Sequence, residues 1–415
     1  MSNYLFTEQN GRVIPLEDKI FGINRQAKEM EAKVGKEAVT NATVGSLLDD
    51  NGKLIVLSSV VDVLKNLEPA DYADYAPIGG TPDFKKDIQK AAFRNFKPSG
   101  HTGVVATPGG TGGLRNTFAN FSKPGDKILT SDWFWATYTT IAQEIGRGIE
   151  TFKLFDENRN FNIASFNEKA QDLIEKQGRL IVLINTPAHN PTGYSLTVDD
   201  WDKVIKSIKA MCTGDRKVTI LVDAAYIDFA GDADEYRKFL PLLDNLPDNI
   251  LTVISYSLSK TFTLYGMRTG AMICMTQNKE IADEFVRVCE FSSRASWSNC
   301  PRAGMAVLSR IYADEALLAK VDKERNEYMN ILLRRGKAFE AAAKELDLEI
   351  VPFDAGFFAS IPCDNPEEIS KELQKDGIFT VPLAKGVRVS VASISEERCA
   401  MIPKKFCEAR DSLKK

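Results

Sequence analysis

The chain has 415 residues, of which 44% are hydrophobic and 27% charged, and a formal net charge of −4. This length is sufficient for two domains with a large core, and the composition is ordinary for a soluble globular protein. Because basic residues are dispersed among acidic ones, we expect no nucleic-acid partner.

Hydropathy and cysteine content indicate the cellular compartment in which we expect the protein. No uncharged run reaches the roughly 18 residues needed to cross a bilayer, so we expect no membrane segment. Residues 1–8 lack the basic start and apolar run of a secretion signal. The seven cysteines are widely spaced and contain no Cys-x-x-Cys pair, which favours a reducing cytoplasm. With only two histidines, we expect no metal site.

In chain order, the first elements are helical. The first fifty residues are polar with a helical pattern, which breaks over 41–45. Thr81-Pro82-Asp83 then predicts the cap and first turn of a helix over 83–96. The middle of the chain alternates helical patterns with short apolar runs, at residues 103–106, 127–130, 180–185, 218–223, 251–255 and 271–275. This alternation predicts an α/β fold with a buried, mostly parallel sheet covered by helices on both faces.

The last quarter of the chain has a different pattern. A long helical stretch follows Pro301 and continues to about Leu346, and strand-like residues follow over 348–361 and 378–392. We expect this part to form a smaller α+β domain, with the long helix bridging the two domains. The prediction is a large domain over 55–325 and a small domain that combines 1–54 with 326–415.

The stretch Ser257-Leu258-Ser259-Lys260 is the strongest chemical signal. It ends a predicted apolar strand, and Arg268 follows eight residues after the lysine. A lysine amine in this position can hold an aldehyde cofactor as an imine, while Ser257 and Arg268 bind a phosphate. The pattern therefore predicts a site for pyridoxal phosphate.

Two further motifs follow predicted strands, where open α/β sheets bind ligands. The glycine-rich residues 107–115 precede a helix, so their backbone N–H groups can bind a phosphate at its N-terminus, although such a turn is often only structural. Asn190-Pro191-Thr192-Gly193 offers the Asn190 amide to a cofactor oxygen; the alternative is a simple tight turn. The sequence leaves open whether the Asn190–Pro191 bond is cis or trans.

An acidic residue and an aromatic residue complete the set. Asp223 ends an apolar strand, where burying a carboxylate needs a cationic partner such as a protonated pyridine nitrogen; the alternative is a helix cap. Trp135 lies where it can stack on a flat heteroaromatic ring; the alternative is a core position.

Taken together, these motifs resemble the class I aminotransferases of pyridoxal-phosphate fold type I, in the aspartate and aromatic branch, over about residues 39–393. The resemblance implies that Lys260 is the Schiff-base lysine and the proton shuttle, and that Asp223 pairs with the pyridine nitrogen. It implies that Asn190 and Tyr226 contact the phenolic oxygen of the cofactor. The phosphate would be held by Gly110, Thr111, Ser257 and Arg268.

The resemblance also assigns substrate and interface residues. Arg388 matches the residue that binds the substrate α-carboxylate, beside Asn190 and Trp135. Arg294 matches an arginine that reaches across a dimer interface to a distal carboxylate, and Tyr75 a tyrosine that reaches the neighbouring subunit's phosphate. The pocket would also be lined by Gly45 and Phe357. A homodimer with shared active sites is therefore expected.

This chain departs from the family pattern at three positions. Tyr138 stands where many members have a histidine that supports the ring-nitrogen aspartate, Trp133 replaces a proline, and Gly109 replaces a serine of the phosphate loop. These departures affect substrate preference more than cofactor use.

The activity implied is transamination between an amino acid, either aspartate or another dicarboxylic or aromatic one, and a 2-oxo acid such as 2-oxoglutarate. The sequence leaves open the choice between aspartate and aromatic donors. One alternative is a pyridoxal-phosphate lyase that catalyses β-elimination on the same fold, and a more remote one is a non-catalytic regulator that binds the cofactor.

Overall fold

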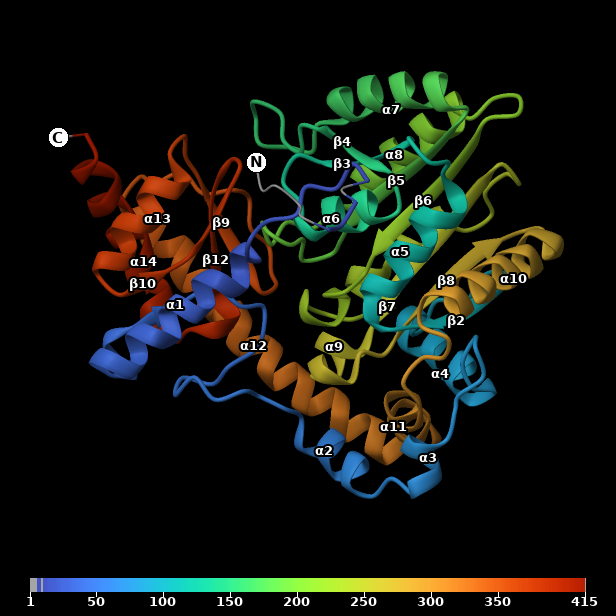
Figure 1. Cartoon of the computed structure of the whole chain (residues 1–415), viewed down its shortest axis with the longest axis horizontal. Helices are drawn as coiled ribbons and strands as arrows, with labels where there is room; N and C mark the ends of the chain where they lie inside the picture. Colours follow the sequence, from blue (N-terminus) through green and yellow to red (C-terminus); the bar gives the residue numbers. More distant parts are fainter. Residues whose placement is uncertain (1–5, 9, 415) are drawn as a thin grey trace.

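The computed structural model describes residues 6–8 and 10–414. Most of the opening segment, on which the expectation of no secretion signal rests, lies outside the described residues. In the part that the structure describes, no helix has both the length and the apolar character needed to cross a bilayer. One large sheet with its helices fills one side of the molecule, and a smaller group of helices and strands lies beside it (Figure 1).

The large sheet has seven strands in the order β2-β8-β7-β6-β5-β3-β4. Strands β3 to β7 pair in parallel, and β8 is antiparallel to both of its neighbours. This arrangement confirms the predicted α/β fold. The bounds of the strands are β2 (His101–Thr107), β3 (Lys127–Ser131), β4 (Gly148–Phe152), β5 (Arg179–Asn185), β6 (Lys217–Asp223), β7 (Ile250–Ser257) and β8 (Gly270–Thr276).

Alternate residues of these strands supply two separate cores, one on each face of the sheet. Ile181 and Leu183 of β5 pack against α5 (Gly109–Phe121), α6 (Thr137–Glu144) and α10 (Lys279–Ser296). Val182 and Ile184 belong to the core on the other face. That face is covered by α4 (Pro82–Phe93), α7 (Ile163–Gln177), α8 (Val198–Met211) and α11 (Arg302–Ala313). The sheet is therefore covered on both faces, as its apolar runs predict.

The smaller group of elements surrounds an antiparallel sheet in the order β11-β12-β9, with a short parallel pair β1-β10 beside it. The bounds of these strands are β1 (Thr40–Asn41), β9 (Phe358–Pro362), β10 (Ile378–Phe379), β11 (Val381–Leu383) and β12 (Gly386–Ser390). They pack with α1 (Lys19–Val34) and α13 (Pro366–Lys375), and α14 (Glu396–Ser412) packs against α13 and the long helix α12 (Glu315–Glu345). The predicted domain boundaries at residues 54 and 325 stay a prediction.

Several predicted elements differ from the structure in their bounds; the strand predicted over 378–392, for example, is divided into β10, β11 and β12. The helix predicted after Pro301 is two helices, because Asp314 caps α12 (Glu315–Glu345) by accepting from the backbone N–H groups of Ala316 and Leu317. The strand predicted over 348–361 begins only at Phe358. The helix predicted over 83–96 ends at Phe93, because Arg94 adopts a positive φ of 53°.

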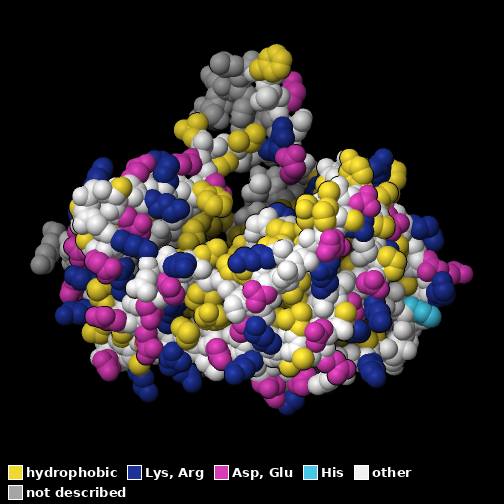
Figure 2. Space-filling view, turned by 90° about the horizontal axis from the view of Figure 1, so that it is seen from below, with side chains coloured by type: hydrophobic (Ala, Val, Ile, Leu, Met, Phe, Trp, Pro, Cys, Tyr) yellow, Lys and Arg dark blue, Asp and Glu magenta, His cyan; other side chains and the backbone are white. Residues whose placement is uncertain are grey.

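Three helices remain, α2 (Ser58–Lys65), α3 (Pro69–Ala73) and the four-residue α9 (Leu258–Thr261). Helix α2 packs against α11 and α12, α3 packs against α11, and α9 follows β7 directly. Helix α12 extends from the smaller group to α2 and α11, so it joins the two parts of the molecule (Figure 1). Seen from another side, hydrophobic side chains gather around a hollow in the surface (Figure 2).

Candidate active site

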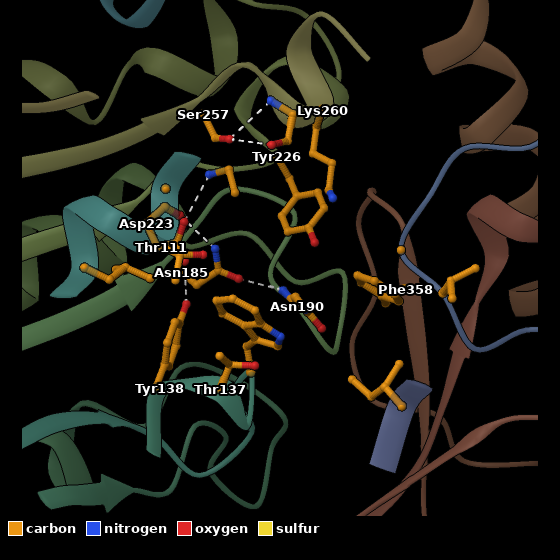
Figure 3. Close-up of a pocket in the computed structure, with 18 of the residues that line it drawn as sticks. Thr111, Thr137, Tyr138, Asn185, Asn190, Asp223, Tyr226, Ser257, Lys260 and Phe358 are labelled. Carbon is orange, nitrogen blue, oxygen red and sulfur yellow. Dashed lines mark hydrogen bonds between the residues drawn. The ribbon is translucent and has the colours of Figure 1, made fainter. Parts of the chain in front are cut away.

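A cavity of about 380 Å³ lies at the carboxyl ends of β5, β6 and β7, against the smaller sheet. It brings together most of the residues predicted from the sequence. They are Gly45, Gly110, Thr111, Trp135, Asn190, Asp223, Tyr226, Ser257, Lys260, Arg268 and Arg388. Figure 3 shows several of these side chains directed toward one another from both parts of the molecule.

Lys260 lies in α9, the single helical turn that follows β7 directly. Its amine lies 4.7 Å from the ring centre of Tyr265 and 5.7 Å from that of Tyr226. Burial lowers the pKa of Lys260 to about 8, and the neighbouring charge of Arg268 acts in the same direction. A lysine with this pKa is partly neutral near pH 8, which is the form that attacks an aldehyde.

Asp223 ends β6 and is buried. The hydroxyl of Tyr138 donates to its Oδ2 at 2.6 Å, and the backbone N–H of Ala225 donates to Oδ1 at 3.2 Å. Burial raises the pKa of the Asp223 carboxyl, and the two hydrogen bonds act against that rise. A buried carboxylate held in this way suits a protonated pyridine nitrogen, which compensates the cost of its burial.

Arg388 is a buried side chain on β12 that faces the cavity from the smaller sheet. Its Nη1 donates to the Asn190 side-chain oxygen at 3.3 Å, and its Nη2 donates to the carbonyl of Thr43 at 2.7 Å. Its buried Nε has no hydrogen-bond partner. Burial lowers the pKa of Arg388 to about 10, so the group is still cationic at neutral pH. An incompletely bonded guanidinium in a cavity fits a carboxylate.

The opposite end of the cavity suits an anion. Helix α5 begins at Gly109, and Ser255 donates from its hydroxyl to the carbonyl of Gly110 at 3.0 Å. A Cβ atom placed on Gly109 would lie 2.6 Å from Nη2 of Arg268, so the guanidinium lies directly against the start of the helix. A helix N-terminus beside an arginine is a binding site for phosphate. The residues present therefore fit pyridoxal phosphate at both ends of the cavity.

Three residues predicted for the site do not line this cavity. Tyr75 is 83% exposed, and Arg294 is also exposed, with its guanidinium bonded to the Ser298 hydroxyl at 2.6 Å. The two residues belong to neighbouring segments, because Asn299 donates to the carbonyl of Ala76 at 2.7 Å. Both lie on the outer surface of the chain, so their predicted roles require a second subunit.

The third residue is Phe357, which does not line the cavity, although its ring centre lies 5.8 Å from the Lys260 amine. Phe358 lines the cavity instead, and its ring lies 4.2 Å from the Arg388 guanidinium carbon. Phe357 is fully buried and packs against the rings of Tyr226 and Phe229. Gly45 does line the cavity, and a Cβ atom there would lie 2.7 Å from Cζ of Phe358.

Sequence reasoning missed Asn185, which connects two parts of the site. Its side-chain amide donates to the carbonyl of Asp223 at 2.7 Å, and its side-chain oxygen accepts from the backbone N–H of Asn190 at 2.7 Å (Figure 3). The signal was present, because Asn185 is a polar residue that ends an apolar strand, and it pairs in register with Asp223. Ile20 and Phe21 of α1 also line the cavity, and nothing in their sequence context indicates this.

Comparison with known proteins shows the family of the chain. Residues 37–406 match the family model for aminotransferase class I and II, so the chain belongs to that family. The aspartate aminotransferase of Pseudomonas aeruginosa is 27% identical over 401 residues, covering 93% of this chain and 96% of the relative. The aromatic-amino-acid aminotransferase of Escherichia coli is 25% identical over 378 residues, covering 88% and 92%.

Among solved structures, an aminotransferase from Anaerococcus prevotii has a TM-score of 0.94 and 38% identity, and the match covers 97% of this chain and 98% of that one. Membership of the family confirms the expected class of enzyme, a pyridoxal-phosphate-dependent aminotransferase. The individual roles assigned to the site residues stay predictions.

Proposed function

We propose that the enzyme transfers the amino group of aspartate, or of another dicarboxylic or aromatic amino acid, to a 2-oxo acid such as 2-oxoglutarate. The observation that carries this proposal is the presence of Arg388 and Lys260 in one cavity, a cation for the substrate α-carboxylate and an amine for proton transfer. Relatives of the chain include enzymes named for aspartate and for aromatic amino acids, which supports both donor classes.

Each site residue has a distinct part in this proposal. When bound, pyridoxal phosphate supplies a ring that accepts electrons from the substrate Cα. Lys260 takes the Cα proton at its Nζ, since its lowered pKa of about 8 leaves a useful fraction of neutral amine. Asp223 keeps a proton on the ring nitrogen by hydrogen bonding and charge. Arg388 orients the substrate through a paired contact with its carboxylate.

The preference for a second carboxylate rests on Arg294. This residue is exposed and lies outside its own chain's cavity. We propose a homodimer in which Arg294 of the partner subunit completes each site, with Tyr75 of the partner subunit beside the phosphate. A guanidinium there favours aspartate and glutamate. The aromatic lining already present, Trp135, Phe21 and Phe358, supports acceptance of a ring when the guanidinium moves aside.

Reduction of the holoenzyme with borohydride, followed by peptide mapping, tests the cofactor lysine. The label is expected on Lys260, and a label on any other lysine would overturn the assignment. A panel of amino donors, followed through the visible absorbance of the cofactor, then tests the substrate. Fast amino transfer from aspartate is expected, and release of ammonia instead of amino transfer would identify a lyase.

The variant Arg388→Lys tests the α-carboxylate contact. It keeps the charge but loses the planar fork, so kcat/KM for every donor is expected to fall by about a hundredfold or more. Arg294→Ala is expected to lower kcat/KM for aspartate much more than for phenylalanine. Equal loss for the two donors, or none for aspartate, would show that Arg294 does not select a second carboxylate.

A further inference from the structure

Asp228 is a buried carboxylate that lies outside the cavity lining and has no part in the chemistry described so far. Its Oδ2 accepts from the hydroxyl of Tyr256 at 2.7 Å and from the hydroxyl of Thr261 at 2.8 Å. Its Oδ1 accepts from Nη2 of Arg237 at 2.8 Å. Three separate segments therefore meet at a single carboxylate.

The segments of Thr261, of Tyr256 and of Asp228 itself also carry site residues. Thr261 follows Lys260 directly, and Tyr256 comes directly before Ser257. Asp228 itself lies two residues after Tyr226, in the 3₁₀ turn Ile227–Phe229. The carboxylate thus joins the turn that follows Tyr226 to the helix that bears Lys260.

Helix α9 needs such an external attachment. It spans only Leu258–Thr261, and a single helical turn is unstable on its own because nucleation fixes several residues for one hydrogen bond. The hydroxyl of Thr261 is the side-chain donor that connects the last residue of this turn to another segment. At the start of the turn, the backbone N–H of Leu258 donates to the carbonyl of Thr269 at 3.0 Å, and Arg268 donates to the Ser259 hydroxyl at 3.2 Å. The Thr261 bond is therefore the one that fixes the end of the turn next to Lys260.

The carboxylate is well suited to hold its partners. Burial alone would raise the pKa of Asp228, but the charges of Arg237, Arg325 and Arg94 outweigh it and hold the pKa well below the usual range. Arg237 is anchored in turn, because its Nε donates to the carbonyl of Ala92 at 2.8 Å in the last turn of α4. Asp228 is therefore a fixed, ionised acceptor.

We propose that Asp228 is a positioning residue for transamination, which fixes the one-turn helix of Lys260 relative to Tyr226 through Thr261 and Tyr256. The inference rests on the proposed role of Lys260 as the cofactor lysine. It goes beyond that role because Asp228 sets the distance between the Lys260 amine and the Tyr226 hydroxyl. Asp228 does this without contacting the substrate or the cofactor.

The test uses Thr261→Val in the holoenzyme, which removes one hydroxyl and keeps the side-chain shape. The expected result is a fall in kcat of about tenfold with KM for the donor within about twofold, because the reacting amine is misplaced while the substrate contacts are intact. The midpoint of the pH-dependent visible absorbance of the cofactor is expected to move by about half a unit or more. Thr261→Ser should restore both quantities.

Thr252→Val is the matched control. Thr252 is also a fully buried threonine, on β7, and its hydroxyl donates to the carbonyl of Leu243 at 2.9 Å, away from the cavity. It is expected to lower the unfolding temperature without moving the absorbance midpoint. If Thr261→Val behaves in the same way as Thr252→Val, Asp228 is only structural and the proposal is overturned.

Tyr256→Phe removes the other hydroxyl from Oδ2 and serves as a second variant if Thr261→Val does not fold. A normal absorbance midpoint and a normal kcat in that variant would also overturn the proposal. Failure of the proposed function is recognised separately, by a borohydride label in the wild-type enzyme on a lysine other than Lys260.

Discussion

At the scale of single residues, Asp223 and Tyr138 form a buried contact at the wall of the cavity. The phenol donates to Asp223 Oδ2 at 2.6 Å, and both groups are fully buried. Burial raises the pKa of Tyr138 well above its usual value, so the phenol stays protonated and acts only as a donor to the carboxylate. It therefore favours the ionised form of Asp223 at every working pH.

The variant Tyr138→Phe should lower kcat by about tenfold, because a hydrogen bond to a buried charged group is worth about 1.5–3 kcal/mol. The loss is expected with every donor, since the ring nitrogen is common to all of them. Tyr194→Phe is the matched control: that phenol also donates to a carboxylate, Asp200, at 3.0 Å, but lies outside the cavity lining. A similar kcat in both variants would contradict the role given to Tyr138.

The amine of Lys260 provides a second prediction at this scale. Its pKa falls from 10.5 in an exposed chain to about 8, because burial and Arg268 disfavour the charged form. In the cofactor-free protein, acetylation of Lys260 should therefore rise with pH and level off above about pH 8. Labelling of exposed lysines should still be rising there. Mass spectrometry of the Lys260 peptide measures how far this lysine is acetylated at each pH. If acetylation levels off only near pH 10.5, the pKa of an exposed lysine, the Lys260 amine is solvated.

At the scale of elements, the start of α5 is the feature on which cofactor binding depends. Gly109 has a positive φ of 68°, and a Cβ atom there would lie 2.6 Å from Nη2 of Arg268. Gly109→Ala should weaken cofactor binding by about tenfold, because Arg268 must move away from the helix N-terminus. Titration of the cofactor-free protein, followed by absorbance, measures the affinity.

Gly125→Ala separates backbone strain from the contact with Arg268. Gly125 also has a positive φ, of 90°, but a Cβ atom there would meet nothing within 4 Å. Both variants should lose about 1 kcal/mol of stability from the backbone alone. Only Gly109→Ala should lose cofactor affinity, and an equal affinity in the two variants would argue against a phosphate site at α5.

Elements also show what the sequence could predict. Buried strands such as β5 and β6 are continuous apolar runs, so they were found, and so was Asp223 at the end of β6. Asn185 at the end of β5 was not recognised as a site residue. Strand β4 was missed because it lies at the sheet edge and all but its last residue are only partly buried, so it has no apolar run. Phe357 was named for the pocket and Phe358 was not, although both rings lie beside that of Tyr226, because the start of β9 cannot be placed to one residue from its apolar pattern.

At the scale of the whole molecule, the two groups of elements are joined beside the site. The backbone N–H groups of Asp354 and Ala355 both donate to the carbonyl of Gly193 at 3.0 Å, and the Ser360 hydroxyl donates to the carbonyl of Pro191 at 2.8 Å. Arg388 thus approaches Asn190 from the smaller sheet, and Ser360 of the same sheet is hydrogen-bonded to Pro191, the residue after Asn190. The resemblance places Arg388 beside Asn190, but the bonds from residues 354, 355 and 360 to this turn have no local signal in the sequence, because they join segments more than a hundred residues apart.

The last prediction concerns the dimer. Arg294 lies outside the cavity of its own chain, so the proposed role requires that it act in the partner's site. Chains carrying Lys260→Ala and chains carrying Arg294→Ala should each have little activity toward aspartate. When the two are co-expressed, the mixed dimer should regain one complete site, with Lys260 from one chain and Arg294 from the other. Isolation of that dimer with two different affinity tags allows its kcat per site to be measured.

The same pair of variants excludes action within one chain. If Arg294 served its own cavity, the only chain with Lys260 would still lack Arg294, and the mixed dimer would be no more active toward aspartate than the Arg294→Ala parent. As a control, each variant is also prepared as a dimer of two differently tagged copies of itself. This control measures whether the tags and the exchange of subunits change the activity. Recovery of about half of the wild-type kcat per dimer therefore distinguishes a shared site from an independent one, because a single complete site is formed for each pair of chains.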